Sequence, residues 1–386
     1  MAIGASEAVS LLFQPLPVKG LTLKNRVVFP PCVTNFAAED GSITERSRAY
    51  YAARAKGGAA LVIVEASYVT PEARAFACNV GIHDDRLVPG LRGLVEAIHA
   101  GGALAAIQLW HAGRRAKPAF TGLESVSASA IAGVDGIVPR ALSVAEIAAV
   151  AEAFGEGARR AREAGFDMVE LHMAHGYLIN QFLSPSSNQR DDEYGGSFEN
   201  RLRFALEVVA AVRRRAGADI PIIARISADE FLPGGLTLAE TQIVARRLQE
   251  AGVDVISVSG GLPEAPTIGA TGLKKGPAKT PPGYFVHLAA GIKGAVGVPV
   301  IAVGRLGDPA VAGQVLAGGH GDLIALGRGL LADPEWPNKV AAGRDAEIRR
   351  CTCCNGCHHH LYQQHPIVCK QNNQLGQEYL LQAGRV

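Results

Sequence analysis

Apolar residues recur along the chain in short, nearly continuous runs that alternate with longer amphipathic segments. Runs that are apolar on both faces are typical of parallel strands covered by helices on either side. Eight such runs predict strands, namely Arg26–Pro30, Ala60–Ala66, Ala103–Trp110, Met168–Met173, Pro221–Ser227, Val253–Ser259, Pro299–Gly304 and Asp322–Arg328. The pattern therefore predicts a repeated strand–helix unit.

Helix signals occupy the spaces between the predicted strands. Ser143 and Glu146 fit the capping box, in which side chains satisfy the free amides of the first helical turn, and Thr237 and Glu240 repeat it. The glycines that follow the Ala- and Arg-rich helical runs, where C-terminal glycines belong, are Gly165, Gly217 and Gly252. Eight strand–helix units predict an α/β protein built as one (β/α)₈ TIM barrel. An open, doubly wound sheet is the alternative.

Two segments depart from this repeat. Residues 111–142 are long for a strand-to-helix connection and rich in Gly, Pro and Ser, which favours a lid or a binding surface. The second segment follows Arg349 and holds five of the seven cysteines within nineteen residues. In a reducing compartment such clustering indicates metal ligation rather than disulfides. We therefore expect a barrel over residues 1–345 and a metal-cluster tail over residues 346–386 that packs on it.

Composition and charge narrow the function classes. The chain has 386 residues, of which 19% are charged, and a net charge of +2, so neither nucleic acid nor an anionic membrane is expected as a partner. No apolar run reaches membrane-spanning length, and the N-terminus lacks the order of a signal peptide. The default expectation is a cytoplasmic protein that acts on a small molecule, and we expect it to form a homo-oligomer.

The fourth predicted strand ends in three side chains that can form hydrogen bonds. His172, His175 and Tyr177 occur within six residues, and Gly176 allows a bend between them. The functional site of a barrel lies at the carboxyl ends of its strands, so these rings should converge on whatever binds there. One such ring alone would be read as a buried polar group satisfied locally. All three at one strand end indicate catalytic residues.

Other strand ends carry groups suited to a phosphorylated, planar cofactor. Gly304-Arg305 and Gly327-Arg328 follow the last two strands, where barrels commonly bind phosphate: glycine lets backbone amides approach an anion and arginine adds a bidentate partner. Gln108 and Arg225 lie on nearby strands as a neutral hydrogen-bonding group and a fixed cation. Such a pair suits a heterocycle that gains negative charge on reduction.

Several long motifs at these positions resemble those of the old yellow enzyme family of NADH:flavin oxidoreductases. The motifs are Asn25–Thr34, Val64–Ser67, Gln108–Arg114, Glu170–Pro185, Asn188–Arg201 and Gly327–Pro334, and the resemblance extends from about Leu12 to Asp333. It implies non-covalent FMN on a TIM barrel, reduced by NAD(P)H. Carried over residue by residue, it implies flavin contacts at Pro30, Pro31, Cys32, Ala66, Gln108, Arg225, Gly304, Arg305, Gly327 and Arg328.

The cysteine spacing narrows the resemblance to one branch of that family. Cys351-x₂-Cys354-x₂-Cys357-x₁₁-Cys369 is similar to the iron–sulfur segment of the trimethylamine dehydrogenase and 2,4-dienoyl-CoA reductase branch. Four thiolates suit a [4Fe–4S] cluster, and a structural zinc is the alternative. Cys353 is an extra thiol, and the histidines at 358–360 are expected to be solvated rather than ligands.

The chain departs from this branch in two ways. Branch members usually continue into an FAD- and NAD-binding module, whereas this chain stops at Val386 with no Gly-x-Gly-x-x-Gly after the cysteines. A separate subunit could carry that module, the chain could be truncated, or NAD(P)H could reduce FMN directly. Trimethylamine dehydrogenase has a tyrosine where His172 stands. The sixth strand end, Ser259–Glu264, lacks both its aspartate and the histidine of the dienoyl-CoA reductase.

These features predict an FMN-dependent ene-reductase. His172 and His175 would bind the carbonyl oxygen of an α,β-unsaturated substrate or enoate while hydride moves from reduced FMN to the β-carbon, and Tyr177 is the candidate proton donor. The rival prediction is oxidative N-demethylation of a tertiary or quaternary amine, with electrons leaving through the cluster to a partner. An electron-transfer subunit without its own substrate is a third. Cys32 could tune the flavin potential, which we favour, form a thioether to the flavin, or fill space.

Overall fold

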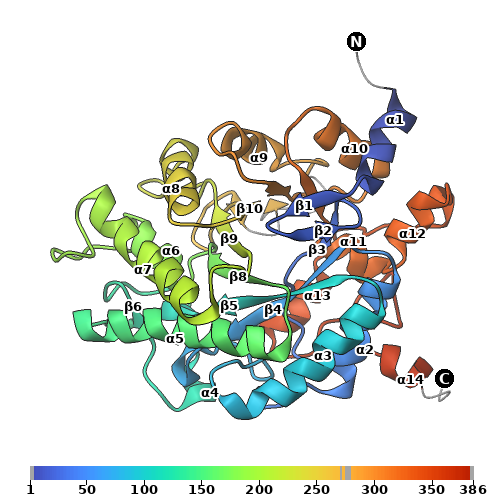
Figure 1. Ribbon diagram of the computed structural model, residues 1–386. Helices are drawn as coiled ribbons and strands as arrows, with labels where there is room; N and C mark the ends of the chain where they lie inside the picture. Colours follow the sequence, from blue (N-terminus) through green and yellow to red (C-terminus); the bar gives the residue numbers. More distant parts are fainter. Residues whose placement is uncertain (1–3, 270–271, 274–279, 383–386) are drawn as a thin grey trace.

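Eight parallel strands close into a barrel in the computed structural model, which describes residues 4–269, 272–273 and 280–382 (Figure 1). The predicted TIM barrel is confirmed, and the open sheet is excluded because β14 pairs with β3. In order around the barrel, the strands are β3 (Val27–Phe29), β4 (Leu61–Tyr68), β5 (Leu104–Trp110), β8 (Met168–Met173), β9 (Ile222–Ser227), β10 (Val255–Ser259), β13 (Val300–Ala302) and β14 (Leu323–Ala325). All eight predicted strands are present, most of them shorter than their apolar runs.

Helices follow the strands in sequence and cover the outside of the barrel (Figure 1). They are α2 (Glu45–Lys56), α3 (Val88–Ala100), α5 (Val144–Ala164), α7 (Phe198–Ala216), α8 (Leu238–Glu250), α9 (Val286–Lys293), α10 (Pro309–Ala317) and α11 (Gly327–Ala332). Each buries an apolar stripe against the strands, and one large core cluster runs through this layer. Among the described residues, no helix combines the length and apolarity needed to cross a membrane.

The predicted helix ends are found where the sequence places them. Ser143 and Thr237 each begin a helix with a complete capping box. Gly165, Gly217 and Gly252 end three helical segments with φ of 93°, 95° and 99°. Residues with a Cβ rarely adopt such backbone angles, so glycine lets the chain turn from each helix toward the next strand.

The amino-terminal segment closes one end of the barrel. After α1 (Ala5–Ser10), strands β1 (Leu16–Val18) and β2 (Leu21–Leu23) form an antiparallel hairpin. Val18 and Leu23 of this hairpin belong to the same buried cluster as Leu61, Met168 and Ile223 of the barrel strands. This end is therefore filled with apolar side chains, and the polar side chains gather at the carboxyl ends of the strands.

The long connection after β5 is ordered and attached to the rest of the barrel. It contains the 3₁₀ turn η4 (Gly113–Arg115), α4 (Pro118–Thr121), and the short parallel pair β6 (Val126–Ser127) and β7 (Arg140–Ala141). The Ser127 hydroxyl donates a hydrogen bond of 2.8 Å to Oε1 of Gln181 in α6 (Leu178–Leu183). A further short pair, β11 (Ile268–Gly269) and β12 (Gly272–Leu273), follows β10.

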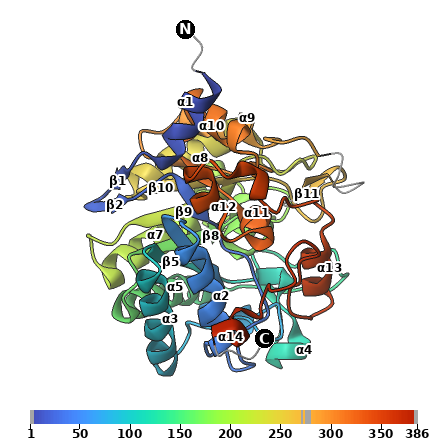
Figure 2. The same ribbon diagram turned by 90° about the vertical axis from the view of Figure 1, so that its right-hand side faces the viewer.

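The cysteine-rich segment lies against the barrel. Its helices are α13 (Gly356–Tyr362) and α14 (Glu378–Gln382), which Figure 2 shows in red on the same side of the molecule as α12 (Trp336–Ala341). The amide of Ile367 donates to the carbonyl of Thr34 at 3.0 Å, and α14 packs against α2. A buried ion pair of 2.6 Å joins Arg54 Nη1 to Glu378 Oε1, with side-chain exposures of 0% and 10%.

We predict that Glu378→Ala destabilises the fold by about 3 kcal/mol, because it leaves the buried Arg54 cation unpaired. Urea unfolding of the parent protein and of Glu378→Ala measures the difference in the free energy of unfolding. Glu347→Ala is the matched control, since its pair with Arg344 is exposed and should contribute only about 0.5 kcal/mol. Equal unfolding midpoints for Glu378→Ala and the parent would show that the pair does not attach the tail.

Candidate active site

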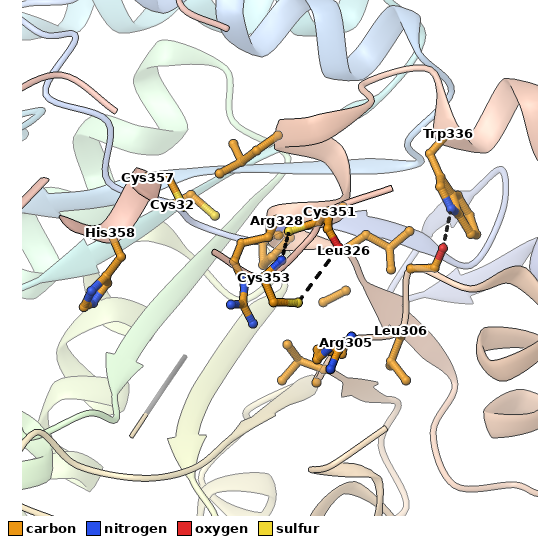
Figure 3. Close-up of a pocket in the computed structure, with 18 of the residues that line it drawn as sticks. Cys32, Arg305, Leu306, Leu326, Arg328, Trp336, Cys351, Cys353, Cys357 and His358 are labelled. Atoms are coloured by element: carbon orange, nitrogen blue, oxygen red, sulfur yellow. Dashed lines mark hydrogen bonds between the residues drawn. The ribbon is translucent and has the colours of Figure 1, made fainter. Parts of the chain in front are cut away.

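A cavity of about 460 Å³ opens at the carboxyl ends of the barrel strands, which is within the range of small-molecule sites. Nine of the predicted catalytic and flavin-binding residues line it, namely Pro30, Pro31, Cys32, His175, Arg225, Gly304, Arg305, Gly327 and Arg328, and so do the predicted metal ligands Cys351 and Cys357. Figure 3 shows side chains of the barrel and of the cysteine-rich segment facing this one space. Ala66, Gln108, His172 and Tyr177 are not among its lining residues. Ala66, Gln108 and His172 are buried, and Tyr177 is partly buried.

The turn after β8 holds the histidine and tyrosine rings together. His175 and Gly176 have φ of 61° and 73°, a left-handed conformation that is unfavourable for histidine. Surrounding polar groups stabilise it: the Gly176 amide donates to Asn180 Oδ1 at 2.6 Å, and Gln181 Nε2 donates to the Gly176 carbonyl at 2.7 Å. The His175 amide donates to Ser227 Oγ at 3.0 Å. Backbone strain of this kind at a strand end often accompanies a functional site.

The His172 ring contacts each of the other two rings. The His172 ring centroid lies 5.1 Å from that of His175 and 4.8 Å from that of Tyr177, both edge to face. The Ala174 amide donates to His172 Nδ1 at 3.3 Å, so a neutral His172 ring carries its proton on Nε2. His175 Nε2 lies 2.7 Å from the hydroxyl oxygen of Ser259 at the end of β10. The turn and these contacts therefore bring the predicted catalytic rings together.

Burial keeps these rings uncharged. Desolvation lowers the pKa of both His172 and His175 well below the ordinary value, and the positive charges of Arg225 and Arg115 act in the same direction. Burial raises the pKa of Tyr177 to about 12, although Arg115 opposes this. At neutral pH the site therefore presents two neutral imidazoles and a neutral phenol.

Glu170 is a site residue that the sequence analysis missed. It lies across from Gln108 in the β5–β8 pairing and accepts a hydrogen bond of 2.6 Å from Gln108 Nε2. Burial raises the pKa of Glu170 to about 7, while Arg225 lowers it. Arg225 Nη1 donates to Ser257 Oγ at 3.0 Å. The sequence signal for Glu170 was a charged residue in the middle of a largely apolar strand. Its hydrogen bond orients the Gln108 amide.

Glu65 was also missed, and it fixes the loop that follows β3. Its carboxylate accepts from the Thr34 amide and hydroxyl, both at 2.7 Å, and from the Tyr51 hydroxyl at 3.4 Å. Burial raises the pKa of Glu65 to about 7 and that of Cys32, in the same loop, to about 12. Cys32 is therefore a thiol at neutral pH. The thiolate is the nucleophilic form, so this disfavours a thioether to the flavin.

The arginines of the two pairs Gly304-Arg305 and Gly327-Arg328 bind different partners. Gly304 has φ of 124°, and a Cβ there would lie 3.0 Å from the Phe285 amide nitrogen, so the position requires glycine. The Arg305 guanidinium donates to the Thr280 carbonyl. Arg328 donates from Nη1 to Asn355 Oδ1 at 2.6 Å, and so reaches into the cysteine-rich segment. Both arginines still line the cavity.

The four cysteines predicted as ligands share a second, much smaller cavity. Cys351, Cys354, Cys357 and Cys369 line a space of about 20 Å³ together with Arg328. Burial raises the pKa of Cys351 to about 11, while the Arg328 charge lowers it. Within the described ranges, no group of three His, Cys, Asp or Glu side chains is placed to hold a metal ion. Four thiols are a donor set that a metal or cluster takes, but their arrangement here does not form a metal site, so ligation stays a prediction.

Two neighbours of these cysteines face the larger cavity instead. Cys353 is buried, lines that cavity and has φ of 57°. His358 also lines it, and burial lowers the pKa of His358 to about 4. The expectation of a solvated histidine stretch is therefore wrong for His358. Cys357 lines both cavities, and Figure 3 shows it beside Cys32.

The chain is similar to several known proteins. The chain matches the NADH:flavin oxidoreductase / NADH oxidase family over residues 11–347. It is 44% identical to the NADH oxidase of Thermoanaerobacter brockii, over 95% of this chain and 56% of that protein. It is 37% identical to the N,N-dimethylglycine/sarcosine dehydrogenase of Chromohalobacter salexigens, over 97% and 54%. The chain thus spans about half the length of these two curated relatives.

A solved structure is also closely similar. The complex of 2-naphthoyl-CoA reductase with 2-naphthoyl-CoA superimposes with a TM-score of 0.92 and 30% sequence identity. The superposition covers 96% of this chain and 58% of that one. The similarity therefore includes the cysteine-rich segment as well as the barrel, since the barrel alone would account for a smaller share of the chain.

We predict that His172 and His175 stay neutral from pH 8 down to pH 6. Unfolding returns each ring to a pKa near 6.5. Below about pH 6.5 the unfolded chain therefore binds more protons than the folded protein, and the free energy of unfolding decreases as the pH is lowered. Histidine-selective NMR, assigned with His172→Gln and His175→Gln, measures the ring titrations. A midpoint near 6.5 for either ring would contradict the prediction.

Proposed function

The chain belongs to the NADH:flavin oxidoreductase / NADH oxidase family, and on that premise we propose that it reduces the carbon–carbon double bond of an α,β-unsaturated carbonyl compound or enoate. The protein is a flavin-dependent oxidoreductase. The observation that carries the finer proposal is the pair of neutral imidazoles, His172 and His175, beside the cavity at the strand ends. The 2-naphthoyl-CoA reductase similarity supports a reductive role.

The imidazole pair suits a carbonyl oxygen that gains negative charge. In a neutral ring one nitrogen carries a proton, and in His172 this is Nε2 because Nδ1 accepts from the Ala174 amide. When the Ser259 hydroxyl donates to His175 Nε2, the proton of that ring lies on Nδ1. Two such donors in a buried site stabilise the developing oxyanion more strongly than water does.

The residues around the larger cavity fit FMN. The cavity has a suitable volume, the Arg225 cation, and the Gly304 and Gly327 corners that let backbone approach a phosphate. Gln108, oriented by Glu170, would contact the heterocycle together with Pro30, Pro31, Cys32 and Ala66, and Arg305 and Arg328 would contact the phosphate. When bound, FMN supplies the hydride for the substrate β-carbon after reduction by NAD(P)H.

Tyr177 is the proposed proton donor to the substrate α-carbon. Its ring lies 4.8 Å from that of His172, so a substrate held by the imidazoles would lie near it. With a pKa of about 12 the phenol stays protonated throughout the physiological range. A general acid needs only to be protonated and within reach when the carbanion develops.

Oxidation of a tertiary or quaternary amine is the second candidate, because a dimethylglycine/sarcosine dehydrogenase is 37% identical to this chain. A free carboxylate beside the reacting carbon would favour a cationic amine. At the end of β10 this chain has Ser259, bonded to His175, and the nearby Glu264 is paired with Arg114 at 2.8 Å. These contacts favour reduction. An electron-transfer subunit without a substrate would have no need of the His172–Tyr177 arrangement.

We further propose that Cys351, Cys354, Cys357 and Cys369, which lie around the smaller cavity, bind a [4Fe–4S] cluster, with a structural zinc as the alternative. This would place the chain in the iron–sulfur branch of the family. The chain spans about half the length of two curated relatives, and we propose an FAD- and NAD-binding or electron-transfer subunit as one source of electrons. Direct reduction by NAD(P)H is the other route.

We predict that His172→Ala and His175→Ala each slow enone reduction by about a hundredfold or more, because each removes one oxyanion donor. Anaerobic oxidation of the reduced flavin by 2-cyclohexenone measures the rate, and FMN absorbance shows that the cofactor stays bound. His320→Ala, at an exposed histidine, is the control and should be unaffected.

The same anaerobic assay separates the two candidate reactions. Trimethylamine should leave the oxidised flavin unchanged, while the enone should reoxidise the reduced flavin. Full activity in the His172→Ala/His175→Ala double variant would contradict the role of the two histidines in binding the substrate carbonyl. Flavin reduction by the amine, with no response to the enone, would favour the dehydrogenase.

We predict about four iron atoms per chain after anaerobic purification, and loss of that iron in Cys354→Ser and Cys369→Ser. Metal analysis and the visible absorption of the cluster measure both. Cys78→Ser, outside the segment, and Cys353→Ser, whose side chain faces the other cavity, should retain the iron. One zinc ion per chain in place of iron would show that the four cysteines form a structural zinc site instead of a cluster site.

A further inference from the structure

Arg115 joins three parts of the molecule beside the proposed proton donor. It lies in η4, in the long connection after β5, and its Cζ is 4.5 Å from the ring centroid of Tyr177. Nη1 donates to the His175 carbonyl at 3.0 Å, and Nη2 donates to the Tyr362 hydroxyl at 2.7 Å. The guanidinium is therefore fixed over the phenol by the catalytic turn on one side and by α13 on the other.

A fixed cation at this position acts on the Tyr177 phenol. A guanidinium over an aromatic face interacts favourably with the ring, and its charge favours the ionised phenolate. The titratable groups that face Tyr177 are His172 of β8, Arg115 of η4 and Tyr362 of α13. Since burial keeps His172 neutral, Arg115 is the cation among these three groups.

Tyr362 belongs to the cysteine-rich segment and has contacts that fix its position. Its ring lies 4.4 Å from that of His358, one turn earlier in α13, and 6.3 Å, edge to face, from that of Phe76. Cys357, a proposed cluster ligand, precedes His358 in the same helix. The tail thus contributes a side chain that contacts the catalytic part of the barrel through Arg115.

We propose that Arg115 is a positioning residue for Tyr177, and that Tyr362 of the cysteine-rich segment holds Arg115 in place. The proposal rests on the proposed function, in which Tyr177 is the proton donor. In that step the phenol O–H bond breaks and a C–H bond forms at the substrate α-carbon. The phenolate left beside Arg115 then takes a proton from water.

Site-specific replacement of Tyr177 by a fluorinated tyrosine tests the electrostatic part. Fluorine makes the phenol more acidic, which brings its ionisation into the stable pH range, and ¹⁹F NMR follows the titration. Arg115→Gln should raise the midpoint by at least about one pH unit, because a cation in contact is lost. Tyr362→Phe should raise it by less, since Arg115 keeps its bond to His175, and Arg115→Lys should restore part of the shift.

Arg86→Gln is the matched control, because Arg86 is an exposed arginine that pairs with Asp40 and Asp84 and does not line the cavity, and its midpoint should equal that of the parent. Equal midpoints in Arg115→Gln and the parent overturn the proposal. If Arg115→Gln fails to fold, Tyr362→Phe decides the outcome, because Tyr362 is 49% exposed and the substitution removes only a hydroxyl. An unshifted midpoint in Tyr362→Phe then overturns the role of the tail.

Single-turnover kinetics separate this proposal from the proposed function. Arg115→Gln should slow reoxidation of the reduced flavin by 2-cyclohexenone several-fold, up to about tenfold, and leave flavin reduction by NAD(P)H unchanged. If the parent itself does not reduce the enone, the proposed function fails while the ¹⁹F titration still judges Arg115. Enone reduction with an unshifted titration would overturn the Arg115 proposal alone.

Discussion

In the turn after β8, two consecutive residues with positive φ, His175 and Gly176, place two imidazoles and a phenol within contact distance. Histidine alone would not hold that backbone, since a left-handed conformation costs an L-residue roughly 1–2 kcal/mol. Asn180 and Gln181, both buried in α6, bind the amide and the carbonyl of Gly176. The geometry of the proposed chemistry therefore depends on two amide side chains that need not touch a substrate.

Burial then sets the charge state of the site. The imidazoles are neutral because desolvation disfavours their protonated form, and the Arg225 and Arg115 charges reinforce this. Burial also raises the pKa of Glu65 and Glu170; Glu170 accepts a hydrogen bond from Gln108, and Glu65 accepts one from Thr34 in the loop that carries Cys32. A cavity with fixed cations and neutral donors suits a substrate that becomes anionic.

The cysteine-rich segment packs on the barrel and lines part of the cavity at the carboxyl ends of the strands. The Arg54–Glu378 ion pair attaches its last helix, and Arg328 spans from the larger cavity to the cysteine loop through Asn355. Tyr362 extends the contact to Arg115 and so to Tyr177. Electron transfer through a cluster and proton transfer at the substrate would consequently share one connected set of side chains.

The sequence by itself determined the barrel, because eight apolar runs, capping boxes and terminal glycines are local patterns that each specify an element. It also located His172, His175 and Tyr177 as candidate catalytic residues and four cysteines as candidate metal ligands, because their spacing is short and their chemistry distinctive. It did not reveal Glu65, Glu170, Ser259 or Arg115, whose importance depends on partners from other strands and loops. Only the closed barrel decides those contacts, since strand register and burial determine which polar groups meet and which of them lose their charge.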